Sequence, residues 1–354
     1  MLIFLIVVLL FAAILEYLSL RGGVSSVNVD FTLSTMRSEP GEEINVITTV
    51  KNTGRLPVSY LCVRTSYPLC AQLPEGVGER GDLFLCTVSD IYRFWLRQKI
   101  TRSMPFSIEK RGVHIIAGKD IHRGDFLGFK TTTGHLTQRR EVLIYPRRLE
   151  NSALIEALGS YTGETSAQRW LIRDPILTIG IREYTGNEPM RTISWSQTAR
   201  RGELMVREFD FTRSMNCCLL FCTDGTQYEE TQLMDTCCSA ARTICEELAA
   251  RGVETSFFTN SYLAGYREEN IRYCKAAENK MQELLDLLAR ITPLRCCPAE
   301  ELAEFCLNSQ PDAAAYVILT PHDNDRAQRA RAMLETRTGL SALVITGDDL
   351  EVDG

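Results

Sequence analysis

The stretch CCLLFC at residues 217–222 is a continuous apolar run of strand length. Such a run is typical of a strand buried on both faces, as in a parallel sheet with helices on either side. A helix-like pattern follows from Glu229 to Arg251 and ends at Gly252, and residues 253–258 return to a strand pattern. Further helices are predicted near residues 268–291, 298–307 and 325–338, and further strands at 316–319 and 342–345. Residues 215–354 are therefore predicted to form an α/β domain with a mostly parallel sheet.

Residues 26–148 show short strand patterns and no helical period. Apolar and polar residues alternate from Val27 to Leu33 and again from Ile44 to Val50, and Pro40-Gly41-Glu42 between them favours a turn. Strands at this spacing predict an antiparallel β-sandwich.

The N-terminus is the most apolar part of the chain. The run from Met1 to Leu15 contains no polar residue, and apolar residues continue past Glu16 until Arg21. About 20 residues of helix cross a hydrocarbon core of roughly 30 Å. A cleaved signal peptide is the alternative interpretation. The sequence, however, has no basic residue before the apolar run and no small-x-small cleavage site after it. We therefore expect a transmembrane anchor over residues 1–21, which contacts the lipid bilayer through residues 1–20.

The cysteines and the first positive charge favour a single-pass protein of the cell membrane with cytoplasmic domains. The chain has 13 cysteines, several in adjacent pairs such as Cys217-Cys218 and Cys296-Cys297, and no CxxC pair. This arrangement indicates reduced thiols, as in the cytoplasm, and not a disulfide framework or a zinc site. Arg21 follows the apolar run, which places the rest of the chain on the cytoplasmic side.

Charge is distributed unevenly. Residues 91–148 carry 13 Lys/Arg against 4 Asp/Glu, a net charge of +9, and residues 215–354 carry 12 against 23, a net charge of −11. The two stretches either dock on each other or bind different partners. The basic stretch lacks the aromatic residues that stack on bases, so no nucleic-acid partner is expected.

A motif rich in arginine lies between the two domains: residues 180–209 read GIREYTGNEPMRTISWSQTARRGELMVREF. The residue types in this motif and their spacing predict a strand, a turn, a helix from Pro189 to Gly202 and a second strand. The residues singled out are Arg182, Tyr184, Gly186, Asn187, Arg191, Trp195, Ala199 and Arg200. Arg191 and Trp195 share one face of the predicted helix. These residues either fasten the sandwich to the next domain by hydrogen bonds and cation–π contacts, or bind a partner or an anion.

This motif resembles the signature of the domain of unknown function 58 family, in which Arg-x-Tyr, a Gly-Asp turn, Arg-x-Ile-x-Trp and Ala-Arg follow one another. The upstream segments Pro40-Gly41-Glu42 and Lys51-Asn52-Thr53-Gly54 resemble the family as well. Asn187 stands where the family usually has Asp. The resemblance implies a von Willebrand factor type A-like (Rossmann-like) domain over residues 215–354, joined to the sandwich by residues 149–214. It also implies a MoxR-type AAA+ ATPase as partner.

The metal-binding form of the type A fold has Asp-x-Ser-x-Ser after its first strand. Here residues 222–226 read Cys-Thr-Asp-Gly-Thr, so a thiol replaces the first carboxylate. A thiol is a poor ligand for a hard cation such as Mg²⁺. Asp224, Thr226 and Asp323 are the candidates for a degraded magnesium site, and an ordinary polar loop is the favoured interpretation. We expect no cofactor.

No catalytic motif is found, and the four histidines are dispersed. The sequence therefore predicts a non-enzymatic scaffold or adaptor, anchored in the membrane, that acts in the assembly or remodelling of protein complexes. Two alternatives stay open: a metal-dependent adhesion-type receptor, for which Asp224, Thr226 and Asp323 have to converge, and a hydrolase with an unrecognised nucleophile and base.

Overall fold

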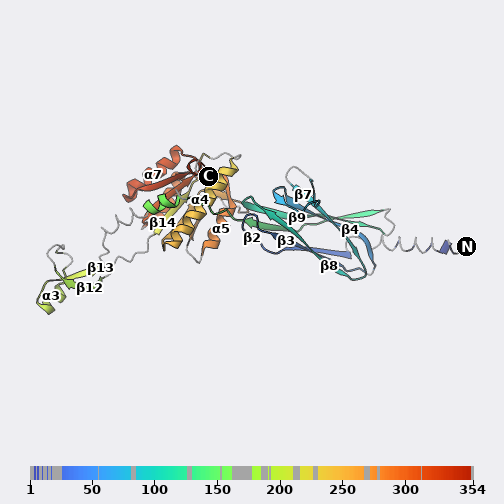
Figure 1. Ribbon diagram of the computed structural model, residues 1–354, viewed down its shortest axis with the longest axis horizontal. Coiled ribbons are helices and arrows are strands. Elements are labelled where there is room, and N and C mark those ends of the chain that lie inside the picture. Colours follow the sequence, from blue (N-terminus) through green and yellow to red (C-terminus); the bar gives the residue numbers. More distant parts are fainter. Residues whose placement is uncertain are drawn as a thin grey trace. The chain divides into compact units, whose positions relative to one another are not determined.

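The computed structural model of the chain divides into two compact units (Figure 1). One unit comprises Met1–Arg147 with Leu285–Ile291, and the other comprises Arg148–Leu284 with Thr292–Gly354. The residues described are 4, 6–7, 10, 14, 17, 26–54, 56–80, 85–125, 130–151, 154–161, 178–184, 190, 193–209, 216–225, 230–266, 272–276, 280–311 and 313–351.

The first unit consists of two sheets. The smaller sheet has the order β1 (Val27–Leu33), β3 (Ile44–Asn52), β8 (Lys99–Ile108), β5 (Ala71–Gln72). The larger has the order β2 (Arg37–Ser38), β11 (Arg139–Ile144), β9 (Gly112–Gly124), β4 (Val58–Pro68), β7 (Leu85–Phe94), β6 (Glu79–Arg80), with β10 (Thr131–His135) also paired to β9. Neighbouring strands are antiparallel except for β2 and β11.

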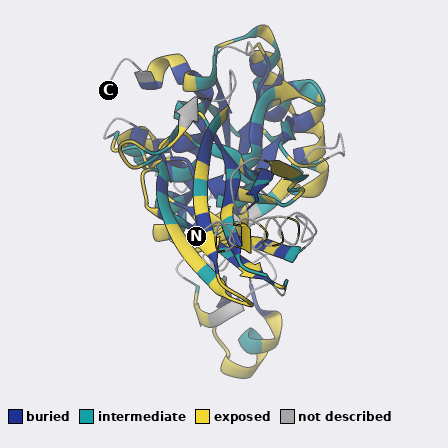
Figure 2. Cartoon of the chain, turned by 90° about the vertical axis from the view of Figure 1, so that its right-hand side faces the viewer, coloured by how far each residue is buried: buried dark blue, intermediate teal, exposed yellow. Residues whose placement is uncertain are grey.

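The alternation of side chains explains how the two sheets bury a core. Along β1, Val27, Val29 and Phe31 are buried, the residues between them are exposed, and Leu33 is half-buried. Figure 2 shows the chain with buried residues in dark blue and exposed residues in yellow. Phe31 and Ile44 of the smaller sheet pack in one cluster with Tyr67 and Ile116 of the larger. The inner faces of the two sheets thus form one apolar layer.

A buried ion pair lies within the larger sheet. The Asp120 carboxylate accepts hydrogen bonds from Nε and Nη2 of Arg64, both at 2.5 Å. These hydrogen bonds lower the pKa of Asp120 below its ordinary value.

The segment Leu285–Ile291, far along the chain, also belongs to the first unit. Nη1 of Arg111 donates to the carbonyl oxygens of Leu288 at 2.7 Å and Ile291 at 3.1 Å. The Tyr145 hydroxyl donates to Oδ1 of Asp286 at 3.0 Å. Arginine suits this role because its planar fork satisfies several carbonyl groups at once.

The second unit is built on a five-stranded sheet with the order β17 (Arg272–Ala276), β15 (Glu254–Thr259), β14 (Asn216–Phe221), β19 (Ala315–Thr320), β20 (Ala342–Thr346). The four strands β15, β14, β19 and β20 are parallel, and β17 is antiparallel to β15. The helices of this unit include α4 (Thr231–Ala250), α6 (Ala299–Ser309), α7 (Asp325–Thr338) and α8 (Gly347–Glu351). A short pair, β16 (Ser261–Leu263) and β18 (Ile291–Arg295), stands outside the sheet, and α5 (Met281–Arg290) precedes β18.

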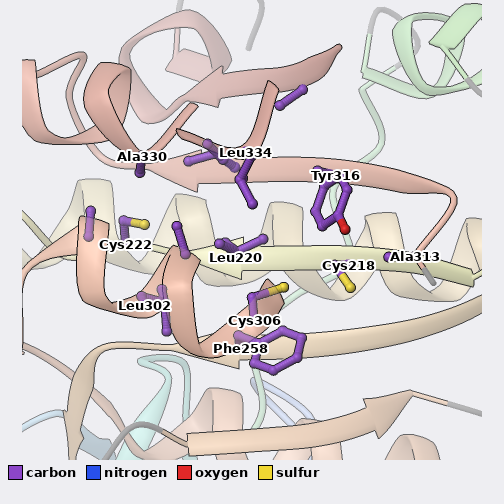
Figure 3. Close-up of a cluster of buried hydrophobic side chains, with 14 residues drawn as sticks. Cys218, Leu220, Cys222, Phe258, Leu302, Cys306, Ala313, Tyr316, Ala330 and Leu334 are labelled. Atoms are coloured by element: carbon purple, nitrogen blue, oxygen red, sulfur yellow. The ribbon is translucent and has the colours of Figure 1, made fainter. Parts of the chain in front are cut away.

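After Asn216, strand β14 is apolar at every position, and helices cover both of its faces. Cys218, Leu220 and Cys222 lie in one buried cluster with residues of α6 and α7 (Figure 3). The intervening residues are equally buried, and Cys217 lies near Cys245 of α4. A strand covered on both faces needs apolar side chains at every position.

One element of the fold class predicted from the sequence is wrong. Among the residues that the structure describes, no helix is long and apolar enough to cross a membrane. The expected transmembrane anchor over residues 1–21 and the single-pass membrane location with cytoplasmic domains are both corrected. The physical reason lies in the sequence, because the uninterrupted apolar run ends at Leu15, before Glu16, and is shorter than the roughly 20 residues that a span needs. The fold class is mixed α/β with many strands.

Candidate functional site

The arginine-rich motif folds as a hairpin that carries a short helix. Strand β12 (Thr178–Glu183) pairs antiparallel with β13 (Met205–Phe209), and α3 (Trp195–Arg201) lies between them in the sequence. Gly202 ends α3 with φ at +79°, a left-handed conformation that suits glycine. Ile193, Met205 and Val206 are buried in this hairpin.

The motif residues lie mainly on the surface of the hairpin. Helix α3 begins at Trp195, and Ile193 forms a β-bridge with Val206, so the helix predicted from Pro189 is wrong in its start. Trp195 is 63% exposed, which differs from the burial expected if it fastened two domains together. Arg182, Ala199 and Arg200 are also exposed, and Tyr184 is half-buried. Gly186, Asn187 and Arg191 lie outside the described residues.

Apolar side chains are unusually exposed on this hairpin. Trp195 is accompanied by Met190, 71% exposed, Leu204, 43% exposed, and Ile181, 39% exposed. Contiguous patches of exposed apolar side chains mark surfaces that contact other molecules. We call Ile181, Met190, Trp195 and Leu204 the hairpin surface.

A second group of functional residues lies at the carboxyl edge of the five-stranded sheet, where ligands of α/β folds bind. Asp224 follows β14 and is 1% exposed, and Asn260 follows β15 and is fully buried. Nδ2 of Asn260 donates to Oδ2 of Asp224 and to the carbonyl oxygen of Cys297, both at 2.8 Å. Oδ1 of Asn260 accepts from the backbone N–H of Thr223 at 3.0 Å and from its hydroxyl at 3.3 Å. The Asn260 amide therefore holds two strand ends and the loop after β18 together.

Two guanidinium groups face the other oxygen of Asp224. Nη1 of Arg295 donates to Oδ1 of Asp224, and Nη1 of Arg326 lies 3.6 Å from the same oxygen. Asn324 caps α7 by accepting from the backbone N–H groups of Arg326 and Ala327, and its Nδ2 donates to the Asp224 carbonyl oxygen at 3.0 Å. The buried carboxylate is thus neutralised by arginine side chains of its own chain.

Two of the three residues considered for a magnesium site, Asp224 and Asp323, lie in the described part of the chain. Asp323 is exposed and accepts a hydrogen bond from Gln328 at 2.7 Å, whereas Asp224 is buried and its carboxylate pairs with Asn260 and Arg295. Thr226 lies outside the described residues. Within the described part of the chain, no group of three His, Cys, Asp or Glu residues could hold a metal ion. Cys222 is fully buried, and burial, with the nearby Asp224 charge, raises the pKa of its thiol far above the ordinary value.

His322, after β19, has both ring nitrogens beside carboxylates. Nδ1 lies 2.9 Å from Oδ2 of Asp348, and Nε2 lies 3.0 Å from Oε2 of Glu230. The hydrogen bond with Asp348, and then the one with Glu230, raise the pKa of His322. An imidazolium that donates to two carboxylates has no lone pair to accept a proton, so this arrangement fits a structural clip better than a general base.

Sequence reasoning missed four residues of the sheet edge: Asn260, Arg295, Asn324 and Arg326. One signal was available for Asn260, a polar residue directly after an apolar strand. The convergence of Arg295 and Arg326 on one carboxylate depends on how the end of β18, the start of α7 and the loop after β14 meet. No local sequence pattern indicates this meeting.

The region of the chain that matches a known protein family starts in the hairpin. The family model described as "Protein of unknown function DUF58" matches residues 180–290. The chain carries a DUF58 segment. A distant relative, "Uncharacterized protein YeaD" of Bacillus subtilis (strain 168), is 23% identical over 211 residues, which cover 60% of this chain and 50% of that protein. The chain thus spans about half the length of this relative. Both findings support the DUF58 family, and the hairpin surface and the carboxyl-edge residues Asp224 and Asn260 all fall in the DUF58 segment.

Solved structures give only weak likenesses. The cohesin module of a family 33 glycoside hydrolase from Clostridium perfringens ATCC13124 has a TM-score of 0.24 at 13% identity and covers 34% of this chain and 96% of its own. A type II cohesin domain from the cellulosome of Acetivibrio cellulolyticus has a TM-score of 0.24 at 13% identity and covers 33% of this chain and 95% of its own. Likenesses at this level carry no argument about function.

Proposed function

We propose that this DUF58 chain is a protein-binding scaffold or adaptor without catalytic activity, which acts with a MoxR-type AAA+ ATPase in the assembly or remodelling of protein complexes. The observation that carries the proposal is the exposure of the hairpin surface, above all Trp195 at 63% and Met190 at 71%. Exposed tryptophan anchors are enriched among the residues that dominate protein–protein binding. The choice of a MoxR-type AAA+ ATPase as the partner rests on the resemblance of the arginine-rich motif to the signature of the domain of unknown function 58 family.

Two features of the α/β unit support a role without catalysis. The buried carboxylate Asp224 already pairs with Arg295 and Arg326, and His322 already pairs with two carboxylates. Both groups are engaged in ways that stabilise loops. The same pairing weighs against the adhesion-type receptor, because a divalent cation at Asp224 would have to displace two guanidinium groups.

We propose further that this unit is a von Willebrand factor type A-like domain. Its central parallel strand β14, its helices on both faces and its polar strand-end loops support this interpretation.

The test is the affinity of the full chain for a purified MoxR-type AAA+ ATPase, measured by biolayer interferometry. Trp195→Ala should weaken binding about tenfold or more, since buried interface tryptophans contribute on the order of 2 kcal/mol or more. Trp95→Ala is the matched control, because Trp95 is 74% exposed and lies in the first unit. Equal affinities for the parent and both variants, or an equal loss in both variants, would refute the role of the hairpin surface.

A further inference from the structure

The five-stranded sheet changes its direction of growth beside Asp224. The chain passes from β14 through α4 to β15 on one side, whereas β19 adds to the other side of β14. Ligands in open α/β sheets bind at such switch points, beyond the carboxyl ends of the two strands. Here the loop after β14 supplies Asp224, and the residues after β19 supply Asn324 and Arg326.

Among the described residues at this switch point, two positive side chains meet one buried carboxylate. Two guanidinium groups, of Arg295 and Arg326, face a single carboxylate oxygen of Asp224. The 3.6 Å from Arg326 to that oxygen is too long for a hydrogen bond. Within the described part of the structure, the Arg326 side chain makes no hydrogen bond besides this ion pair, so most of its N–H donors stay available.

Both arginines are accessible, although the carboxylate is not. The side chains of Arg295 and Arg326 are 42% and 39% exposed, and that of Asp224 is 1% exposed. The backbone N–H groups of Arg326 and Ala327 in the first turn of α7 already donate to Asn324, so the guanidinium groups are the donors that we consider for a ligand. The buried Asp224 carboxylate thus holds the two solvent-facing guanidinium groups in place. A ligand therefore loses less binding free energy to the ordering of these side chains.

We propose that Arg295 and Arg326 form a phosphate-binding site at the carboxyl edge of the sheet. Guanidinium forks match phosphate oxygens bidentately. Two forks from different elements, β18 and α7, suit a tetrahedral anion, which offers several oxygen edges, better than a carboxylate, which offers two oxygens. Asp224 positions the arginines and competes with the ligand for them.

The site is tested by isothermal titration calorimetry of the full chain with inorganic phosphate at constant ionic strength. Arg326→Gln should weaken phosphate binding about tenfold or more, because it removes charge-assisted hydrogen bonds. Arg329→Gln is the matched control: Arg329 lies on the same helix, is 66% exposed and pairs with Glu300. It should leave the affinity unchanged. Asp224→Asn removes the competing charge and should tighten binding.

Titrations with other anions distinguish a phosphorylated side chain from free phosphate as the ligand. Phosphoserine that binds as well as inorganic phosphate would assign the site to a phosphorylated side chain, and weaker binding would assign it to the free ion. Acetate and chloride should bind far more weakly. The proposal is overturned if the parent chain takes up no phosphate, if Arg326→Gln and Arg329→Gln behave alike, or if chloride gives the same curve. Arg295→Gln is a second variant, and thermal melting with and without phosphate shows whether each variant is folded. The titration needs no protein partner, so its outcome is independent of the scaffold proposal.

Discussion

Replacing Asn260 by alanine tests the organisation of the sheet edge. The Asn260 amide makes four hydrogen bonds, two to Thr223 and one each to Asp224 and Cys297. Each is worth about 1 kcal/mol net, and buried partners left without one add a desolvation penalty. Since Asn260 is fully buried, water cannot replace the amide without a rearrangement. We expect Asn260→Ala to lower the free energy of unfolding of the α/β unit by about 3–5 kcal/mol.

Urea unfolding followed by far-ultraviolet circular dichroism suits this test. The helices α4, α6 and α7 lie in the α/β unit, so the helical signal reports mainly on that unit. Asn216→Ala is the control, because Asn216 begins β14 at the opposite end and its Oδ1 has no hydrogen-bond partner in the described structure. It should change stability by about 1 kcal/mol or less. A loss in Asn260→Ala no larger than in the control would show that the amide does not organise the edge.

Further predictions concern single groups. The hydrogen bonds that His322 donates to Asp348 and Glu230 raise its pKa above 6.5. The stability that these bonds add is therefore complete below pH 6.5 and is lost as the pH rises through the raised pKa, so the melting temperatures of the parent and His322→Gln should converge at alkaline pH. Asp120→Asn should destabilise the first unit by about 1–3 kcal/mol in a denaturant titration, because it breaks a partly buried, doubly hydrogen-bonded pair with arginine. Trp195→Ala should change thermal stability by no more than about 0.5 kcal/mol, as expected for an exposed residue; a larger loss would indicate burial. The rate of association with the ATPase should fall as salt rises if the net charge of −11 on residues 215–354 steers the encounter, and a rate that ignores salt would exclude that steering.

Local pattern predicted several regular elements, but the helix expected near residues 268–291 is wrong in its first part, where the structure has the strand β17 (Arg272–Ala276) before α5 (Met281–Arg290). The alternation from Val27 to Leu33 and the apolar run at 217–222 mark strands that the structure contains as β1 and β14. Gly202 ends a helix, as its position in the motif indicated. These features depend on side-chain period and backbone preference, which a sequence displays directly.

Features set by tertiary contacts were not predictable in the same way. Arg295 and Arg326 look like ordinary charged residues in the sequence, and only the meeting of β18, α7 and the loop after β14 brings both to Asp224. Trp195 is large and apolar, which favours burial, yet the hairpin is too small to cover it. The N-terminal segment suggested a membrane span because its apolar residues extend over about 20 positions, but the uninterrupted apolar run ends at Leu15.

The central claim is that the hairpin surface binds the ATPase. Hydrogen–deuterium exchange of the full chain, with and without a MoxR-type AAA+ ATPase, tests it most directly. We expect slower exchange in peptides that cover Ile181 to Leu204, and no such protection in a Trp195→Ala chain that is folded. Unchanged exchange in these peptides at saturating ATPase, or protection confined to other parts of the chain, would contradict the account.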